Sequence, residues 1–531
     1  MFYSESSSID IMKPLLGILL LALMSSALKA QEPTMLSLYG YGGNGIEQYL
    51  RHVTTTDDGG FIVTLSTNST GTYGNVDSFC GGDDSRSIFQ KFSADGSVLE
   101  WSKCYGYLGD SAFVFAFPKP GDEMVLGGTY NSNVGWGYII TKQDAAGNTI
   151  WQREYSKGNS PLLRDMINTS DGGYLMVGDA LYLDTNVLST YGSCDLWALK
   201  LDSLGNKVWS KTFGGSGWDE AENVLEGSNG ELYLFGTTQS SDFDCITTNG
   251  GMNAFLAKVD SAGNTIWTRC YGGSYGERGF DICFDLHENL LMVCASGSSD
   301  SDVTNHINPD STNVWLLKVD SSGNKLWDST YGGGGNEYPR AVCQATDGSI
   351  WIGGYCRWVG GQIDTNYGGQ DGWLLHVDSA GTYINSRVIG SSLQDDILML
   401  HKLSTSDVMT GGYYRDGDGT FSTITNFNGH DAFLSIYGPH STKVTRLSYT
   451  HKDIGIYPNP ATDHFNLQLP KDGEKYKVVV KNITGQELMN ENISGTKGII
   501  QINVRSFPRG LYCVQVTDGQ GNVGLGKLVI N

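Results

Sequence analysis

The phrase KLDSLGNKVWSKTFGG at residues 200–215 returns as KVDSAGNTIWTRCYGG at 258–273 and as KVDSSGNKLWDSTYGG at 318–333. Each copy contains a tight turn of Asp, Ser, Gly and Asn residues between two short apolar runs, which is the pattern of a β-hairpin. The phrase recurs about every 58 residues. Self-similarity at a fixed period of this size indicates a repeat fold.

Weaker copies of the phrase extend the array. They read FSADGSVLEWSKCYG at 92–106, QDAAGNTIWQREY at 143–155 and HVDSAGTYINSRVIG at 376–390. Each unit contains short apolar or alternating runs bounded by Gly, Asn, Asp and Ser, which favours four strands per unit and no helix. Because one four-stranded sheet cannot bury both faces, we expect the units to stack radially into a β-propeller.

The two ends of the array predict how the ring closes. The first segment, MLSLYGYGG at 35–43, matches the fourth strand of a unit, whereas the last unit ends with its third strand at 431–437. We therefore predict that residues 35–41 complete the seventh blade and so remove exposed sheet edges. The predicted fold class is all-β, with a seven-bladed β-propeller over 31–437, a linker over 438–452 and a small immunoglobulin-like β-sandwich over 453–531.

The repeated LDSxGNxxW phrase resembles the tryptophan-docking repeats of quinoprotein-like propellers. The whole pattern is similar to β-propeller repeat proteins among the exported proteins of gliding bacteria. In the quinone-dependent enzymes of the first group, an adjacent pair of cysteines commonly lies beside the cofactor. This sequence has no adjacent cysteines, so we predict no quinone.

The last segment reads IGIYPNPATDHFNLQLP at 454–470, VVVKNITGQELM at 478–489 and PRGLYCVQVTDGQGNVGLGKLVIN at 508–531. It resembles the C-terminal sorting domain that the type IX secretion machinery recognises; an ordinary immunoglobulin-like accessory domain is the alternative. The resemblance implies delivery to the outer-membrane surface or the medium. It depends on Tyr457, Pro458, Asn459, Pro460, Gly485, Gly510, Tyr512 and Lys527.

The first thirty residues read as an export signal. Lys13 precedes an apolar run at 15–24, and small residues lead to a predicted cleavage between Ala30 and Gln31. The polar start suits a signal poorly, so Met12 is an alternative first residue. The apolar run is too short to cross a bilayer, and we predict no transmembrane segment.

The charge and the cysteines limit the partners and crosslinks. The net charge of −22 repels phosphate backbones, so we predict no nucleic-acid partner. An exported chain with ten cysteines can form disulfides. Cys283 and Cys294 flank a predicted hairpin turn and are our candidate pair, and Cys343 with Cys356 is a looser version of it.

The loops between the second and third strands of the units are long and dissimilar, whereas the other turns are short. Variable loops on one face of a rigid scaffold are where recognition is usually built. Their Ser, Thr, Asn, Asp, Gly and Tyr residues suit a neutral glycan or a basic protein. Solvated loops without a ligand are the alternative.

An acid recurs six residues after the aromatic that precedes each Gly-Gly phrase. A ring of such carboxylates could bind a cation or serve acid/base chemistry, but we favour hydrogen bonds to backbone N–H groups at each blade junction. Calcium at Asp416 and Asp418 or at 299–302 is a further candidate, although neither segment continues into an EF-hand loop; we predict no metal and no cofactor. The recurring acids are Glu47, Asp219, Glu277, Glu337 and Asp395.

The sequence contains none of the HExxH, GxSxG or GxxxxGK[ST] motifs, so we predict no catalytic residue. The favoured function is a binding or adhesion module that recognises a glycan or a protein through the face with the long loops. A polysaccharide hydrolase or lyase that uses carboxylates on that face is one alternative, and a structural surface component is another. Propellers perform all three functions, so the fold does not choose among them.

Overall fold

The computed structural model describes two parts of the chain. Several predictions lie outside the described residues, namely those for the export signal at 1–30, Ala30, Gln31, Glu47, Pro458, Asn459, Gly485 and the linker beyond Gly438. The described ranges are 33–41, 48–56, 58–67, 86–94, 99–105, 112–121, 123–132, 135–144, 147–158, 162–181, 192–242, 244–245, 251–307, 311–424, 430–438, 455–457, 460–468, 475–482, 487–494, 499–518 and 523–530.

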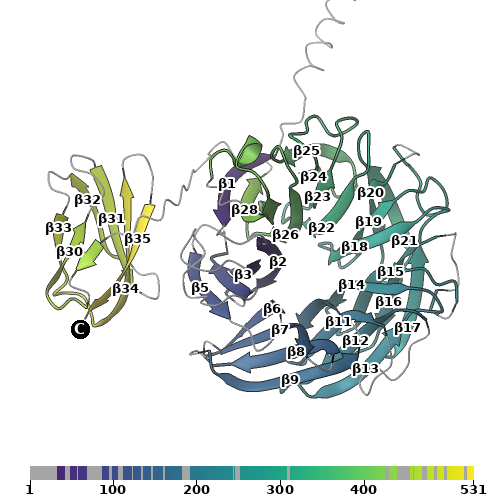
Figure 1. Ribbon diagram of the computed structural model, residues 1–531, viewed down its shortest axis with the longest axis horizontal. Coiled ribbons are helices and arrows are strands. Elements are labelled where there is room, and N and C mark those ends of the chain that lie inside the picture. The colour runs from purple at the N-terminus through teal and green to yellow at the C-terminus, as the bar shows by residue number, and fades with distance from the viewer. Residues whose placement is uncertain are drawn as a thin grey trace, which may run out of the picture.

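Seven four-stranded antiparallel sheets surround a central axis, as Figure 1 shows, and form a seven-bladed β-propeller. The first strand of each blade is the innermost. Blades one to three contain β2 (Gln48–Thr55), β3 (Phe61–Thr67), β4 (Arg86–Phe92), β5 (Leu99–Tyr105), β6 (Ala112–Lys119), β7 (Glu123–Ser132), β8 (Gly135–Gln143), β9 (Thr149–Gly158), β10 (Leu163–Asn168), β11 (Tyr174–Ala180), β12 (Asp195–Leu201) and β13 (Lys207–Phe213).

The other four blades follow the same order around the ring. Blades four and five contain β14 (Asp219–Glu226), β15 (Leu232–Thr238), β16 (Asn253–Val259), β17 (Thr265–Tyr271), β18 (Glu277–Phe284), β19 (Leu290–Ser296), β20 (Asn313–Val319) and β21 (Lys325–Tyr331). Blades six and seven contain β22 (Tyr338–Gln344), β23 (Ile350–Cys356), β24 (Asp371–Val377), β25 (Tyr383–Ile389), β26 (Asp396–Lys402), β27 (Val408–Tyr414), the short 3₁₀ helix η1 (Gly419–Phe421), β28 (Asp431–Gly438) and β1 (Thr34–Tyr41).

The ring closes through the first strand of the chain. β1 pairs antiparallel with β28, from Thr34 opposite Gly438 to Tyr41 opposite Ala432. This pairing confirms the predicted closure, in which an early strand completes the last blade. Because β1 covers the outer edge of β28, the two ends of the propeller are held in one sheet.

The repeated tryptophan joins each blade to the next at the rim. Trp209 of β13 donates from Nε1 to the carbonyl oxygen of Ser261, in the β16–β17 turn of the following blade, at 2.9 Å. A Cβ atom on Gly263, in the same turn, would lie 3.0 Å from the Trp209 ring, so only glycine fits beneath the indole. The same contact recurs between Trp151 and Gly205, Trp267 and Gly323, and Trp327 and Gly381.

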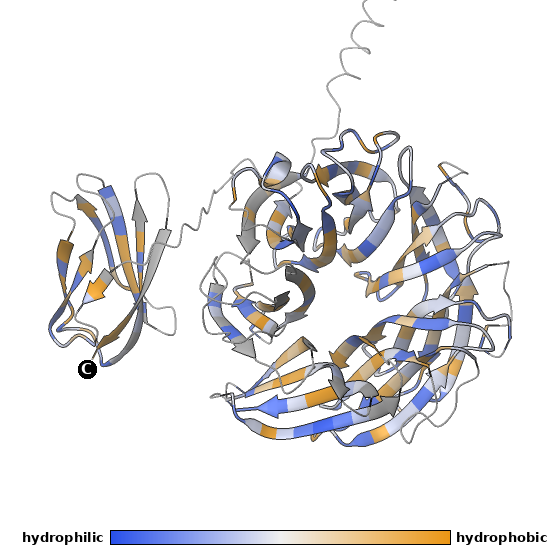
Figure 2. Ribbon diagram, in the orientation of Figure 1, coloured by the Kyte–Doolittle hydropathy of each residue, from blue (hydrophilic) through white to orange (hydrophobic). Residues whose placement is uncertain are grey.

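The hydrophobic core is divided among the spaces between blades. Each cluster of buried side chains draws on two neighbouring blades, as between blades four and five around Phe235, Leu256 and Trp315. Figure 2 shows hydrophobic residues along the strands and hydrophilic residues in many of the connecting loops. Because every blade buries both faces against its neighbours, the middle strands are buried along their whole length, as in β15, β16 and β19.

The C-terminal domain is a two-layer β-sandwich. Tyr512 is buried within it and donates to the carbonyl oxygen of Pro508, and Lys527 lies opposite Cys513 in the ladder. One sheet has the order β29 (Gly455–Tyr457), β30 (His464–Gln468) and β33 (Ile499–Asn503). The other has the order β32 (Glu487–Ser494), β31 (Lys475–Asn482), β34 (Gly510–Asp518) and β35 (Val523–Ile530).

The predicted disulfide between Cys283 and Cys294 is wrong, and both cysteines are free. In the β18–β19 ladder Cys283 lies opposite Leu291, and Cys294 lies opposite Gly279. The two side chains also point to opposite faces of the blade. Cys283 packs against the core shared with blade six, and Cys294 belongs to the core shared with blade four.

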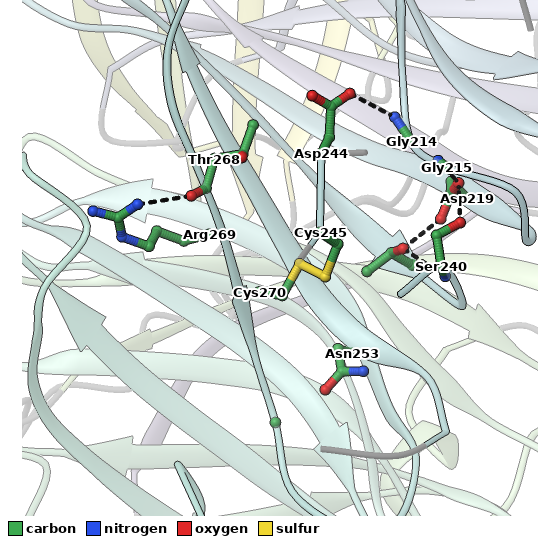
Figure 3. Close-up of a disulfide and its surroundings, with 12 residues drawn as sticks. Gly214, Gly215, Asp219, Ser240, Asp244, Cys245, Asn253, Thr268, Arg269 and Cys270 are labelled. Carbon is green, nitrogen blue, oxygen red and sulfur yellow. Dashed lines mark hydrogen bonds between the residues drawn. A yellow bond between two sulfur atoms is a disulfide. The ribbon is translucent and has the colours of Figure 1, made fainter. Parts of the chain in front are cut away.

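The second predicted pair, Cys343 with Cys356, is also wrong, because both cysteines are free. Their side chains belong to hydrophobic cores on opposite faces of blade six. The structure instead joins Cys245, in the loop between β15 and β16, to Cys270 on β17 (Figure 3). This bond fixes the long loop of blade four to the outer strand of the same blade.

Candidate functional site

Long loops gather on one face of the propeller, which we call the loop face. It is the face where the first and third strands of each blade begin, for example at Asp219 and Asn253 of blade four, and where the second strand ends. The opposite turn face carries the short turns, such as the one closed by the hydrogen bond from Gly263 N–H to the Asp260 carbonyl oxygen.

Four of the recurring acids, Asp219, Glu277, Glu337 and Asp395, lie among the described residues at the start of the innermost strands on the loop face, but they point into the protein. Asp219 accepts hydrogen bonds from Gly215 N–H at 2.7 Å and from the hydroxyl groups of Thr238 and Ser240 (Figure 3). Glu277 accepts from Gly273 N–H at 2.8 Å. These carboxylates hold the connection between two blades, as the repeat pattern favoured.

The two later acids make the same kind of contact. Glu337 accepts from Gly333 N–H at 3.2 Å and Asp395 accepts from Ser391 N–H at 2.6 Å. Both are fully buried, and burial raises the pKa of each carboxyl to about 7. With no exposed oxygen, these acids are not available to a ligand on the surface.

The acids considered for calcium are also bound to backbone groups. Asp300 and Asp302 accept from the N–H groups of Ser274 and Gly272, and Asp418 accepts from Ser392 N–H at 2.7 Å. Asp244 makes the equivalent bond to Gly214 in blade four, as Figure 3 shows. Within the described ranges no group of three His, Cys, Asp or Glu side chains could hold a metal ion.

A cavity of about 340 Å³ opens on the loop face between blades four and five. Glu220 organises one wall of it, because its carboxylate accepts from Trp218 Nε1 at 2.8 Å and from Arg278 Nη2 at 3.1 Å. The indole and the guanidinium are therefore held in fixed orientations. The lining residues are Trp218, Glu220, Thr237, Gln239, Met252 and Arg278.

A row of alternating arginine and aromatic side chains begins at this cavity. Arg278 and Arg340 lie 5.5 and 5.6 Å from the centre of the Phe280 ring. Arg340 also lies 5.3 Å from the Tyr355 ring, which Arg357 approaches at 5.5 Å. We call these five residues the arginine–aromatic ladder. Cation–π contacts at such distances favour the placement of the guanidinium groups beside these rings.

Two carboxyl groups near the ladder hold protons unusually tightly. Burial raises the pKa of Glu222 to about 7, although Arg164 and Arg278 lower it. Burial also raises the pKa of Asp396 to about 7, against the effect of its ion pair with Arg340. Near neutral pH these acids are partly uncharged, so they cancel the charge of the arginines only in part.

Exposed aromatic rings also gather on the loop face. Trp218 and Tyr275 precede the innermost strands of blades four and five, and Trp358 and Tyr367 lie in the loop between β23 and β24. Among the propeller side chains whose exposure the structure describes, the only other exposed tyrosine or tryptophan is Tyr383, at the turn-face end of β25. Rigid amphipathic rings of this kind are common in recognition surfaces.

Sequence reasoning found the loop face but missed the side chains that define the site. The candidates chosen from the sequence were the recurring acids, of which the four that the structure describes are buried, and they did not include Trp218, Arg278, Arg340 or Arg357. A signal was present. Arg278 is the second residue of the innermost strand β18, Arg340 is the third residue of the innermost strand β22, and Arg357 directly follows β23.

Comparison with known proteins identifies the last domain. Residues 455–531 match the model of the secretion system C-terminal sorting domain, which confirms the resemblance seen in the sequence. No helix within the described ranges is long and apolar enough to cross a membrane.

The relatives of the chain match only parts of it. It is 28% identical to the ulvan lyase NLR42 of Nonlabens ulvanivorans over an alignment of 114 residues. This alignment covers 21% of each of the two chains. It is 24% identical to the regulatory protein FlaEY of Caulobacter vibrioides over an alignment of 156 residues. This alignment covers 27% of this chain and 16% of that protein. The chain thus spans about a fifth of the length of the curated relatives it matches.

Among solved structures, the Pan2 WD40 domain of Neurospora crassa aligns with a TM-score of 0.42 and 11% identity, over 78% of this chain and 98% of that one. The propeller assignment itself follows from the seven sheets and their closure. The protein is therefore an exported, secreted or surface-attached β-propeller that carries a C-terminal sorting domain of the type IX secretion system.

Proposed function

We propose that the protein is a secreted or cell-surface module that binds a glycan through the loop face of its propeller. One observation carries this proposal: the exposed rings Trp218, Tyr275, Trp358 and Tyr367 share the loop face with a cavity of about 340 Å³. The C–H faces of a sugar ring pack on flat aromatic rings, and the polar groups beside them can bind its hydroxyls.

The cavity supplies both kinds of contact. Trp218 lines it with its indole held by Glu220, and Thr237 and Gln239 add a hydroxyl and an amide. Because the indole and the Arg278 guanidinium are already oriented by Glu220, little side-chain freedom is lost when a sugar binds. Glu220 is therefore a positioning residue for the site.

The test is retention of the purified full chain on an array of immobilised polysaccharides, with analysis of released products. We expect retention without cleavage, and we expect Trp218→Ala to reduce it at least tenfold. Tyr383→Ala is the matched control, because it removes an exposed ring from the turn face, and it should bind like the wild type. Retention that survives Trp218→Ala and Tyr275→Ala together would contradict the proposal.

A second candidate function, polysaccharide hydrolysis or elimination, has one observation in its favour. Glu222 has no acidic counterpart at the equivalent position of the neighbouring blades, where Arg164 and Phe280 stand. Its pKa of about 7 suits a group that donates a proton at neutral pH. Release of oligosaccharides by the wild type and not by Glu222→Gln would favour this function over simple binding.

A further inference from the structure

The basic residues of the propeller are sorted by type between its two faces. Among the side chains that the structure describes, five arginines lie at the loop face, around the ends of the innermost and second strands, namely Arg164, Arg278, Arg340, Arg357 and Arg415. The lysines of the third strands lie near the turn face instead, namely Lys91, Lys142, Lys200, Lys258 and Lys318. Guanidinium groups therefore concentrate where the cavity opens.

The planar guanidinium group matches carboxylate and sulfate oxygens with two parallel donors, whereas a lysine offers only a point charge. The ladder places three guanidinium groups in a row beside the rings of Phe280 and Tyr355. We propose that the arginine–aromatic ladder binds the acidic groups, carboxylate or sulfate, of an anionic polysaccharide. This inference rests on the proposed glycan-binding function and deepens it by naming the ligand class.

The ladder has donor capacity left for a ligand. Within the described residues Arg340 forms one hydrogen bond, from Nε to Asp396 Oδ2 at 3.1 Å, so its two terminal amino groups are available. Arg357 is exposed and donates to Gln370 from Nη2 alone, at 3.3 Å. Arg278 is tied more firmly, since Glu220 and Glu222 both accept from its Nη2.

The net charge of the chain narrows the class of anion. A protein of charge −22 repels a densely charged polymer such as a nucleic acid. A polysaccharide with one acidic group per sugar unit has a lower charge density and offers apolar sugar faces to Trp218 and Tyr275. The ladder would then take the acidic groups while the exposed rings take the sugar faces.

The experiment compares matched charged and neutral ligands on the full chain by isothermal titration calorimetry. One pair is a galacturonan hexasaccharide and its methyl ester; the other is maltohexaose with a single sulfate on O6 of each unit and maltohexaose itself. We expect at least one acidic member to bind tenfold or more tightly than its neutral partner. A preference in the first pair alone would assign the site to carboxylates, and in the second pair alone to sulfates.

Two variants test the residues. Arg357→Gln removes an exposed guanidinium, and Arg340→Gln removes the central one; each should weaken binding of the preferred acidic ligand at least fivefold. Arg153→Gln is the control, because Arg153 makes the same kind of contact, 5.7 Å from the Trp151 ring, on the outer strand β9. If Arg340→Gln does not fold, Arg357→Gln decides alone.

The outcomes separate the two proposals. Equal affinity for the charged and neutral members of both pairs would overturn the ladder inference while leaving glycan binding intact. Preference for an acidic ligand that persists in Arg357→Gln and Arg340→Gln would place the acidic groups elsewhere and would also overturn it. Absence of binding to all four ligands, together with an empty polysaccharide array, would contradict both proposals.

Discussion

Arg340 of β22 donates from Nε to Asp396 Oδ2 on β26 across 3.1 Å, while Oδ1 of the same carboxyl is buried and has no hydrogen-bond partner among the described residues. The ion pair therefore joins blades six and seven at the ladder. Burial raises the pKa of Asp396 to about 7. A proton on this carboxyl releases Arg340 for another anion.

Binding of an acidic glycan should therefore depend on pH. Between pH 8 and pH 6 Asp396 takes up a proton, and so does Glu222, whose neighbours are Arg164, Arg278, Asp179 and Glu220. Uronate carboxylates remain ionised over this range because carboxylic acids titrate near pH 4. We expect the affinity for the galacturonan hexasaccharide to rise about threefold to tenfold from pH 8 to pH 6, measured by titration calorimetry.

The control for this pH effect is Glu222→Gln, which removes one of the two titrating groups without changing the size of the side chain. Its affinity should vary less between pH 6 and pH 8 than that of the wild type. An affinity that falls toward pH 6 in the wild type would mean that the titration of Asp396 and Glu222 does not govern binding.

The stability of the propeller should also depend on pH. The carboxyls of Glu337 and Asp395 have folded-state pKa values of about 7, well above the value near 4 of an unfolded chain. The folded state binds these protons more tightly, so the contribution of these two groups to stability is greatest at low pH and is lost as the pH rises from about 4 to 7. We expect the melting temperature to fall between pH 5 and pH 8.

Glu337→Gln tests the origin of that decrease. The amide keeps the shape of the protonated acid and can still accept the bond from Gly333 N–H, but it does not titrate. Differential scanning calorimetry should show a smaller fall in melting temperature between pH 5 and pH 8 than in the wild type. An unchanged fall would show that Glu337 contributes nothing to it.

The docking of tryptophan on glycine at the rim can be tested with one matched pair of variants. Gly263 and Gly230 both have positive φ, of 77° and 79°, but a Cβ atom at Gly263 would meet Trp209 at 3.0 Å, whereas Gly230 has nothing within 4 Å. Gly230→Ala should cost about 1 kcal/mol from backbone strain alone. Gly263→Ala should cost about 1–3 kcal/mol more because it displaces the indole.

Chemical unfolding would measure both free energies. If the two variants lose the same stability, the contact between Trp209 and Gly263 does not contribute to the junction between blades three and four.

The disulfide between Cys245 and Cys270 closes a loop with a sequence separation of 25 residues. A crosslink of this span stabilises a protein by about 3 kcal/mol, chiefly by restricting the unfolded chain. We expect the double variant Cys245→Ser, Cys270→Ser to unfold with a free energy lower by about that amount. Peptide mapping of the unreduced wild type should recover the crosslinked pair, and recovery of Cys283 bound to Cys294 would contradict the structure.

Much of the fold could be predicted because the same strand pattern is repeated along the sequence, so each copy supports the assignment of the others. The strand pattern around Trp209, Trp267 and Trp327 returns at a nearly constant period, and the missing fourth strand of the last unit indicates where residues 35–41 must pair. The turn residues and apolar runs suffice for such a prediction, since every blade is a four-stranded sheet that packs against its two neighbours in the same way.

The crosslink and the site could not be predicted in the same way, because they depend on where side chains point. One residue of register decides which face of a blade a cysteine occupies, and Cys283 and Cys294 fall on opposite faces. Cys245 follows a Ser-Ser-Asp-Phe-Asp phrase whose counterpart in the next blade is followed by Val303, so the repeat pattern gives no sign of a cysteine partner there. The cavity and the ladder likewise combine Trp218, Arg278 and Arg340 from different blades, which are far apart in the sequence.

The most direct test of ligand recognition at the loop face is a crystal structure of the full chain with a bound acidic oligosaccharide. We expect an acidic group of the ligand within hydrogen-bond distance of Arg340 or Arg357 and a sugar ring against Trp218 in the cavity between blades four and five. A ligand bound on the turn face, or only on the C-terminal sandwich, would contradict this assignment.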